Sequence, residues 1–328
     1  MIDTLATTFV TCIEAGLLEQ EVILLAKSLR ALDSPIARSQ MIAVQPRRDT
    51  GLSRQTRAAL AKLDVDLVCE NLIGAYDWNP HLNKAAAMRW AETHVTTPFV
   101  TWLDGDMVLL RPLDGLITDA GMSFAAMPAN IDQGTDGADG NAVYWEKVSQ
   151  VVGVPYRPAA LVESVPPAKL IYEYYHGGIY TVRRDDHISD RHFAFFIKIL
   201  EARIASHSCG IYHHDQVALS MAARTAPGTR SLYPREMNYS ISPRQTEKID
   251  RAMLQRCAVL HYHDALLPAG YPQIREFLAH LPEGPRRLIE AASPIGLAMP
   301  PHRRLLRKLR SSLRRRSMQA HIATCAQF

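Results

Sequence analysis

Two aspartates one residue apart, Asp104 and Asp106, interrupt an apolar run and are well suited to bind a metal ion. The run Phe99–Leu103 before them predicts a buried strand, so the acids follow where that strand ends. Ligands of open α/β sheets bind outside the carboxyl ends of strands. Both side chains have the same parity and can point at one hard cation, Mg²⁺ or Mn²⁺, which prefers carboxylate and phosphate oxygens. Gly105 between them lets a diphosphate approach the backbone closely.

The same pair also fits a purely structural interpretation, an acidic turn after a strand, because Asp and Gly favour turns. Three further segments help to decide between a metal site and an acidic turn, since each puts polar residues or glycines at the predicted edge of a strand or helix. They are His176-Gly177-Gly178-Ile179-Tyr180, His213-His214-Asp215-Gln216 and His261-Tyr262-His263-Asp264.

The first third of the chain alternates between strand and helix patterns. This alternation predicts a parallel, doubly wound sheet that carries the acid pair at its edge. The expected strands are Thr8–Ile13, Gln40–Val44, Asp66–Glu70 and Phe99–Leu103, and the expected helices are Leu18–Leu32, a helix from an N-cap at Ser53 to Lys62, and Asn83–His94.

The later part of the chain is less regular. Asp132–Asn141 is rich in Gly and Asp and predicts a mobile loop, and Pro155–Lys169 holds four prolines and predicts an irregular segment that lines a site. Strands are expected at Met122–Met127, Gly177–Val182 and Val259–Tyr262, and helices at Asp190–Ala205, from His214 or Asp215 to Arg224, and at Tyr271–Leu281.

The composition is that of a soluble globular protein of 328 residues, with 47% apolar and 21% charged residues. The net charge of +4 is uneven, because eight basic residues and no acid lie between Arg303 and Arg316. The rest of the chain holds 29 basic and 33 acidic residues. A nucleic-acid binder would spread its basic residues over a folded face, so we expect no nucleic-acid partner.

The five cysteines form no C-x-x-C pair, which argues against a disulfide framework or a zinc site. The N-terminus lacks the basic region and cleavage site of a signal peptide, and no apolar run reaches the length of a membrane span. We therefore expect a cytoplasmic protein.

In their order along the chain, the acid pair, the glycine strand, the Asp-Gln pair and the His-Tyr strand resemble the GT-A glycosyltransferases, most closely the retaining transferases of glycosyltransferase family 8. The resemblance covers about Thr8 to Asp264. It implies a Rossmann-like, mostly parallel α/β sheet flanked by helices. Residues 1–285 would form the transferase domain, with a nucleotide-binding half at 1–110 and an acceptor and sugar half at 111–285. Residues 286–328 would form a basic amphipathic tail.

The resemblance implies a Mn²⁺ or Mg²⁺ ion held by Asp104, Asp106 and His261, with Asp104 also touching the ribose. His263 competes with His261, because strand alternation would put both imidazoles on one face. A buried structural histidine is the alternative for either. In the family an Asp-Gln pair lies at the catalytic centre, which implies catalytic roles for Asp215 and Gln216. Asp215 would bind sugar hydroxyls and Gln216 would lie opposite the leaving group, although Asp215 also suits a helix N-cap.

The donor-binding residues depart from the family in several places. His176 stands where the family has asparagine, next to Gly177 and Gly178. The expected donor-binding set also includes Asp104, Gly105 and three further residues. Cys12 lies near the end of the first strand, Glu14 lies in the turn after it, which lacks the family's aspartate, and Lys84 lies at the start of a helix.

Lys84 would meet the diphosphate at the helix N-terminus or, alternatively, be an exposed surface lysine. The family's lysine after the metal histidine is missing from Asp264–Gly270, so either another cation serves or the loop closes differently.

The basic segment Pro300–Arg316 carries four leucines at helical spacing (Leu305, Leu306, Leu309 and Leu313). It predicts a basic amphipathic helix that binds an anionic membrane surface through residues 303–316. A disordered basic tail and a helix packed on the body through its leucines are the alternatives.

The resemblance, supported by these observations, implies a metal-dependent, hexosyltransferase-like enzyme that moves a sugar from a nucleotide-diphosphate donor, a UDP-sugar, to a glycan or glycolipid, with retention. Polysaccharide or lipopolysaccharide synthesis on the inner face of the membrane would suit it, with the acceptor over the loops between Pro128 and Lys169. One alternative is a nucleotidyltransferase, although the turn Glu14-Ala15-Gly16 has no nearby cation before Lys27. Another is a non-catalytic protein that binds nucleotide sugars or membranes.

Overall fold

The computed structural model describes residues 7–47, 51–130, 132–165, 168–296 and 299–328. Its main sheet has seven strands in the order β11-β6-β9-β4-β1-β2-β3, and all except β9 run in one direction. The expected mostly parallel α/β sheet is thus confirmed. The strands are β1 (Thr7–Cys12), β2 (Met41–Gln45), β3 (Val65–Cys69), β4 (Phe99–Leu103), β6 (Met122–Pro128), β9 (Tyr175–Arg183) and β11 (Thr229–Leu232).

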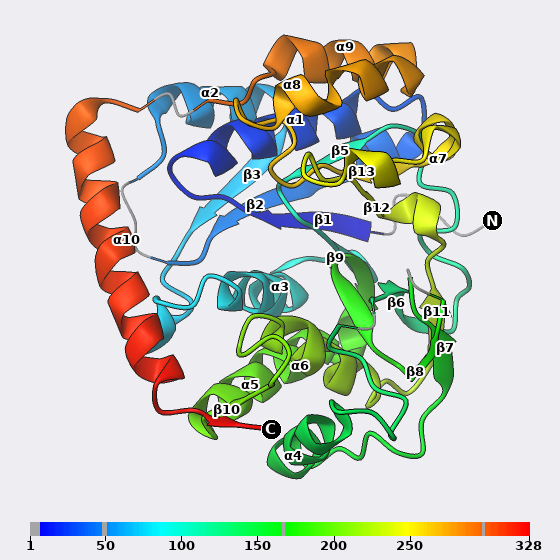
Figure 1. Ribbon diagram of the computed structural model, residues 1–328. Coiled ribbons are helices and arrows are strands. Elements are labelled where there is room, and N and C mark those ends of the chain that lie inside the picture. The colour runs from blue at the N-terminus through cyan, green and yellow to red at the C-terminus, as the bar shows by residue number, and fades with distance from the viewer. Residues whose placement is uncertain (1–6, 48–50, 131, 166–167, 297–298) are drawn as a thin grey trace.

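Helices cover both faces of this sheet, which explains why its central strands are buried on both sides. On one face lie α1 (Leu17–Arg30) and α2 (Arg54–Lys62), and on the other lie α3 (Leu82–His94), α5 (Ile188–Glu201) and α6 (His214–Ala223) (Figure 1). The predicted N-cap is confirmed, because the Ser53 hydroxyl accepts a hydrogen bond from the Thr56 backbone N–H.

A small second sheet brings a late segment of the chain to the acid pair. Its strands are β5 (Met107–Leu109), β12 (Tyr239–Ser240) and β13 (Val259–His261), in the order β12-β13-β5. The antiparallel register of β13 on β5 sets His261 opposite Met107, the residue after Asp106. A third apolar cluster beneath this sheet fixes it to α1. This pairing brings His261 to the acid pair.

Several expected elements differ in extent. The helix expected to reach Ala205 ends at Glu201, and the chain then turns through Arg203 (φ 52°) into the short strand β10 (Ile204–Ala205). The helix expected over Tyr271–Leu281 is α8 (Tyr271–Ile274) followed by a 3₁₀ helix, Arg275–His280.

The loops between the two halves also hold regular structure. Helix α4 (Ala142–Val152) follows the Gly-rich loop, and β7 (Leu161–Glu163) pairs with β8 (Leu170–Tyr172) inside the segment expected to be irregular. Two of its four prolines, at 166 and 167, lie outside the described residues.

The C-terminal part begins with α9 (Glu283–Ala292), which runs across the domain boundary expected at residue 286. Ile289 and Ile295 are buried in the third apolar cluster, so this stretch packs on the body. Helix α10 (Pro301–Ile322) then stands at the side of the molecule toward which β1 and β2 run (Figure 1). Strand β14 (Ala326–Gln327) pairs with β10. None of the described helices has the length and apolarity needed to cross a membrane.

Candidate active site

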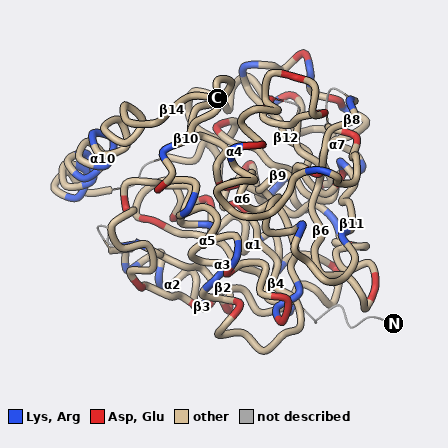
Figure 2. The backbone as a smooth tube through the Cα atoms, turned by 90° about the horizontal axis from the view of Figure 1, so that it is seen from below, with Lys and Arg blue, Asp and Glu red and all other residues tan. Residues whose placement is uncertain are grey.

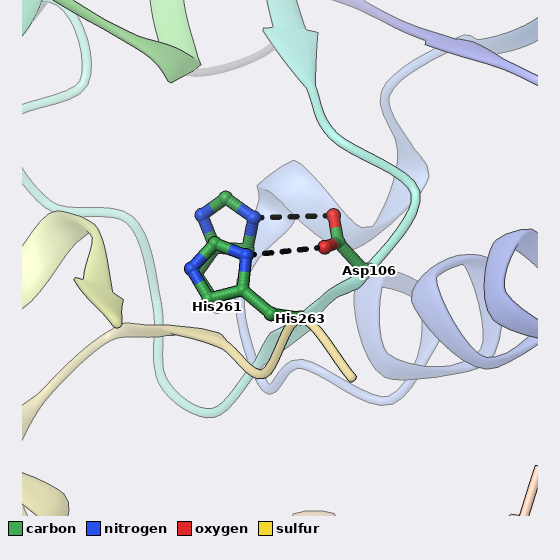
Figure 3. Close-up of side chains that lie close together, drawn as sticks. All are labelled: Asp106, His261 and His263. Atoms are coloured by element: carbon green, nitrogen blue, oxygen red, sulfur yellow. Dashed lines mark hydrogen bonds and ion pairs between the residues drawn. The ribbon is translucent and has the colours of Figure 1, made fainter. Parts of the chain in front are cut away.

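The second aspartate of the pair lies between two imidazoles (Figure 3). Asp106 Oδ1 is 3.1 Å from His261 Nε2, and Asp106 Oδ2 is 3.5 Å from His263 Nδ1. The three residues offer ligand atoms that all lie within 4.8 Å of one another. Asp104 Oδ2 lies 4.0 Å from His261 Nε2. Carboxylate oxygen and imidazole nitrogen together suit Mn²⁺ as well as other first-row divalent cations. These residues therefore fit a metal ion, with both histidines in reach.

The two histidines reach Asp106 in different ways. His261 is the last residue of β13 and is buried, whereas His263 lies beyond the strand with a left-handed backbone (φ 48°) and is exposed. Strand alternation therefore does not explain their common direction. A turn after β13 brings the His263 ring within 3.9 Å of the His261 ring, centroid to centroid.

A buried asparagine that the sequence did not suggest fixes the orientation of the inner imidazole. Asn238 Oδ1 accepts a hydrogen bond from Nδ1 of His261 at 3.2 Å, and this leaves Nε2 to face Asp106. Its Nδ2 donates to Nδ1 of His176 at 2.9 Å. Such outer hydrogen bonds set the tautomer of a metal-binding histidine. Asn238 is thus a positioning residue for the cluster.

Charge holds this cluster together. Burial alone would raise the pKa of Asp106, but the two histidines outweigh it and hold that pKa well below its usual value. Burial would lower the pKa of His261, but the Asp106 carboxylate outweighs it and raises that pKa. Burial, reinforced by the charge on His261, lowers the pKa of His176, so His176 is a neutral hydrogen-bond acceptor.

Lys84 links the acid pair to the Asp-Gln helix. Its Nζ lies 3.2 Å from Asp104 Oδ1 and 3.5 Å from Asp215 Oδ2, and it donates to the Gly177 carbonyl at 2.6 Å. Burial would lower the pKa of Lys84, but the two carboxylates outweigh it and raise that pKa. The interpretation as an exposed surface lysine is therefore wrong. Its charge is already shared between two aspartates.

The two glycines of β9 leave no space for a side chain, because Lys84 and Met107 lie against them. A Cβ on Gly177 would lie 2.9 Å from Lys84 Nζ, and one on Gly178 would lie 2.8 Å from Met107 Cε. Gly105 has a different reason: its Cβ would press on the Leu18 and Val22 side chains of α1, at 3.2 and 3.3 Å. Packing on α1 thus accounts for this glycine, and a contact with the diphosphate stays a prediction.

The Asp-Gln pair opens α6, but Asp215 does not cap it. The N-cap is His213, and Asp215 is the second residue of the helix, paired with Lys84, so the N-cap interpretation is wrong. Gln216 has both ends of its amide engaged, since Oε1 accepts from the Gly177 N–H at 3.1 Å and Nε2 lies 2.6 Å from His213 Nδ1. Burial would raise the pKa of Asp215, but Lys84 outweighs it and lowers that pKa.

These side chains line one cavity of about 250 Å³, which we call the catalytic cavity. Sequence reasoning missed His81 and Tyr212 on its rim, because neither belongs to a recognisable motif; their rings meet edge to face, with centroids 4.9 Å apart. No described residue of the loops between 128 and 169 lines this cavity, so the expected acceptor site there stays a prediction. The lining residues are His81, Lys84, Asp104, Asp106, His176, Gly177, Gly178, Tyr212, His213, Asp215, Gln216, His261 and His263.

The residues expected at the nucleoside end lie beside this cavity. Glu14 is held by an ion pair with Arg47 and accepts a hydrogen bond from Asn83 Nδ2 at 2.9 Å. Cys12, at the end of β1, lines neither described cavity of this region. Burial, with the Glu14 charge, raises the pKa of the Cys12 thiol well above its usual value, so the thiol stays neutral.

A buried carboxyl group on α1 near the acid pair makes stability depend on pH. Burial, with a smaller contribution from Asp106, raises the pKa of Glu21 to about 7. Stability from this group is present below the unfolded-state pKa and is lost as pH rises through the folded-state pKa. We expect Glu21→Gln to stabilise the metal-free protein by about 3 kcal/mol at pH 8 and by almost nothing at pH 4.5, as measured by urea unfolding.

The matched control is Glu290→Gln on α9, whose side chain is exposed. An equal gain at both pH values would contradict the prediction.

Three comparisons with known proteins concern the family and the fold of the chain. The sequence profile of the Rhodobacterales glycosyltransferase domain matches residues 9–226. No curated protein matches the chain. The galactosyltransferase LgtC, solved with donor and acceptor sugar analogues, is 15% identical, over 86% of this chain and 99% of LgtC, with a TM-score of 0.52. An active-site mutant of LgtC is 13% identical, and the match covers 93% of this chain and 99% of the mutant, with a TM-score of 0.53.

The apo structure of the bifunctional glycosyltransferase WbbM is 13% identical over 88% of this chain, with a TM-score of 0.49. The match covers 52% of WbbM, so this chain spans about half of its length. At such low identities the LgtC structures show a shared fold, which confirms the GT-A fold expected from the sequence.

Proposed function

Because this chain belongs to the Rhodobacterales glycosyltransferase family, we propose that it is a metal-dependent transferase. It moves a sugar from a nucleotide-diphosphate donor, a UDP-sugar, to a glycan or glycolipid of the cell envelope, with retention of the anomeric configuration. LgtC, whose fold it shares, was solved with donor and acceptor sugar analogues, which supports a sugar donor and a glycan acceptor for this chain.

One observation carries the proposal: Asp106 meets His261 at 3.1 Å across 155 residues of sequence, beside a lysine shared by two further aspartates. Carboxylates and imidazoles converge here on one edge of the sheet, where ligands of α/β folds bind. A diphosphate that leaves during sugar transfer develops negative charge. An edge that gathers cation ligands and a buried lysine suits that leaving group.

The divalent cation would be held by Asp106 and His261, with Asp104 and His263 as the further ligands in reach. The ion supplies a Lewis acid that stabilises charge on the diphosphate without proton transfer. Its imidazole ligand is kept in the required tautomer by Asn238. With Asp104 as the further ligand, the site would match the ligands that the resemblance to family 8 implies. With His263 in its place, the site would depart from that family.

The transferred sugar would lie against α6. Asp215 is charged and offers carboxylate oxygens to sugar hydroxyls, while Lys84 offsets its charge. Gln216 is neutral and held at both ends, so it orients rather than attacks. This arrangement leaves deprotonation of the acceptor to the departing diphosphate on the same face, which is the course expected for retention.

Donor hydrolysis tests this proposal. We expect slow release of free sugar from one nucleotide sugar in a panel, with Mn²⁺ and not with EDTA, and a product of retained configuration by proton NMR. An inverted product would contradict the family 8 resemblance and leave the GT-A fold unaffected. Tight UDP binding without hydrolysis or transfer over a broad donor and acceptor panel would favour the non-catalytic alternative.

The proposal includes an anionic membrane surface as partner. In α10 the four leucines are between 50% and 61% exposed, so they do not pack on the body, and that alternative is wrong. Exposed basic side chains at Arg304, Lys308 and Arg316 flank this apolar row. An apolar row with a basic border is complementary to anionic lipid head groups. A glycolipid acceptor would lie in the same membrane.

Vesicle binding tests this partner. We expect the double variant Leu309→Ser and Leu313→Ser to bind vesicles containing phosphatidylglycerol at least about tenfold more weakly than the unaltered chain, because two apolar side chains no longer enter the lipid. Co-sedimentation measures the change. The matched control is Leu161→Ser, an equally exposed leucine on β7. Equal binding by the double variant, or binding that needs no anionic lipid, would contradict the membrane proposal.

A further inference from the structure

Helix α10 turns its arginines inward and its leucines outward. Arg303, Arg307 and Arg314 are partly buried at helical spacing, opposite the exposed leucine row. Lysine and arginine gather along this helix more densely than elsewhere (Figure 2). A surface helix normally buries its apolar side, so this orientation requires another reason.

The inward arginines contact the loops at the carboxyl ends of the first strands. Arg307 donates to the Ala15 carbonyl at 3.3 Å, directly after Glu14. Arg314 lies 3.4 Å from Asp77 Oδ2, in the segment before α3. Both contacts hold α10 across the turn after β1, where the sequence predicts the nucleoside of the donor.

A cavity of about 360 Å³ lies between α10 and these loops; we call it the helix cavity. Arg307, Arg314 and Arg315 line it from α10, and Glu14, Arg47 and Trp78 line it from the body. The carboxylate of Glu14 in this cavity is neutralised by its ion pair with Arg47. The helix cavity therefore combines an aromatic side chain with surplus positive charge, which suits an anionic ligand with a flat base.

The helix cavity and the catalytic cavity are lined by residues that neighbour one another. Pro80 lines the first and His81 the second, and Glu14 of the first is hydrogen-bonded to Asn83, the neighbour of Lys84 in the second. Ligand sites usually measure roughly 300–1,000 Å³. The catalytic cavity alone, at about 250 Å³, is small for a whole nucleotide sugar. The two cavities together offer room for it.

Charge balance points the same way. In the catalytic cavity, three aspartates (Asp104, Asp106 and Asp215) face one lysine. One divalent cation there would offset the remaining two negative charges and leave none for the donor's diphosphate. The nearest surplus of cations among the described lining residues of both cavities is the inner face of α10.

We propose that α10 is part of the donor site: the helix cavity holds the nucleoside of the donor, and Arg307 and Arg314 bind the nucleoside diphosphate from there, while its diphosphate extends to the catalytic cavity. This inference rests on the proposed function. It assigns one partner to each face of α10: the inward arginines bind the donor, and the outward leucines bind the membrane. Membrane docking through the leucines would then also hold the arginines over the donor.

Calorimetry with the full chain, Mn²⁺ and UDP tests the assignment. We expect Arg307→Ala and Arg314→Ala each to raise the Kd for UDP about tenfold, because each removes a charge-assisted hydrogen bond to the ligand. Lys308→Ala is the matched control, since it removes one charge from the exposed side of the same helix. Arg307→Lys should restore part of the affinity. Hydrogen exchange adds a readout on the unaltered chain: UDP should slow exchange of the amides of α10.

The outcomes are distinguishable. Unaltered UDP affinity in both arginine variants, with affinity lost in Asp106→Asn, overturns the inference and leaves the proposed function standing. An equal loss in Lys308→Ala also overturns it, because only the long-range field of the helix would then act. Failure of the unaltered chain to bind any nucleoside diphosphate with Mn²⁺ overturns the proposed function and this inference together.

Discussion

Replacing Asp106 with asparagine is expected to lower Mn²⁺-dependent donor turnover by about 10²–10³-fold. Asp106 is the one carboxylate within 3.5 Å of both His261 and His263 among the described residues, so it anchors every ligand set that the cluster allows. An amide there keeps one oxygen but loses the charge that a divalent cation requires.

Steady-state hydrolysis over a range of Mn²⁺ concentrations measures this effect. The matched control is Asp114→Asn, an exposed acid in the same region of sequence. The loss should appear as a higher Mn²⁺ requirement and a lower turnover number. Full metal-dependent turnover in Asp106→Asn would show that the cation lies elsewhere.

Replacing Lys84 with methionine is expected to destabilise the protein by about 3–5 kcal/mol, because the ion pairs are partly buried and two carboxylates would lose their counter-charge. Lys84 holds the pKa of Asp215 down, and a depressed pKa contributes stability above the unfolded-state pKa that is lost as pH falls. In Lys84→Met that contribution is absent. The deficit should therefore be full from pH 7 down to about pH 4 and shrink only below about pH 4, as pH falls through the folded-state pKa of Asp215.

Urea unfolding at several pH values measures this deficit, with Lys62→Met as the matched control on the exposed end of α2. UDP affinity should fall in the same variant, since the catalytic cavity would lose its lysine. A deficit that does not change with pH would mean that packing, and not the two carboxylates, accounts for the role of Lys84.

The order of strands and helices in the first third could be predicted because local pattern determines it. Alternating apolar runs and the Ser53 cap fix β1 to β4 and their helices within a residue or two. The position of the acid pair could likewise be predicted, because the two aspartates directly follow the apolar run of a strand. These features depend on residues close together in sequence, and a parallel sheet leaves few ways to arrange them.

Features that depend on tertiary pairing could not be predicted. Asn238 lies in no motif, and only the pairing of β12 with β13 brings it to His261. The direction of His263 depends on a left-handed backbone conformation, which is uncommon for residues other than glycine and is not marked by the sequence pattern. The leucine pattern of α10 correctly predicted a helix, but spacing alone cannot tell which face meets the body.

A crystal structure of the full chain with Mn²⁺ and UDP tests the central claim most directly. The account predicts one Mn²⁺ bound by Asp106 and His261, with diphosphate oxygens completing its coordination and the nucleoside lying toward α10. It would also show whether Asp104 or His263 is the further ligand. Mn²⁺ at another place, or UDP bound away from this edge of the sheet, would contradict it.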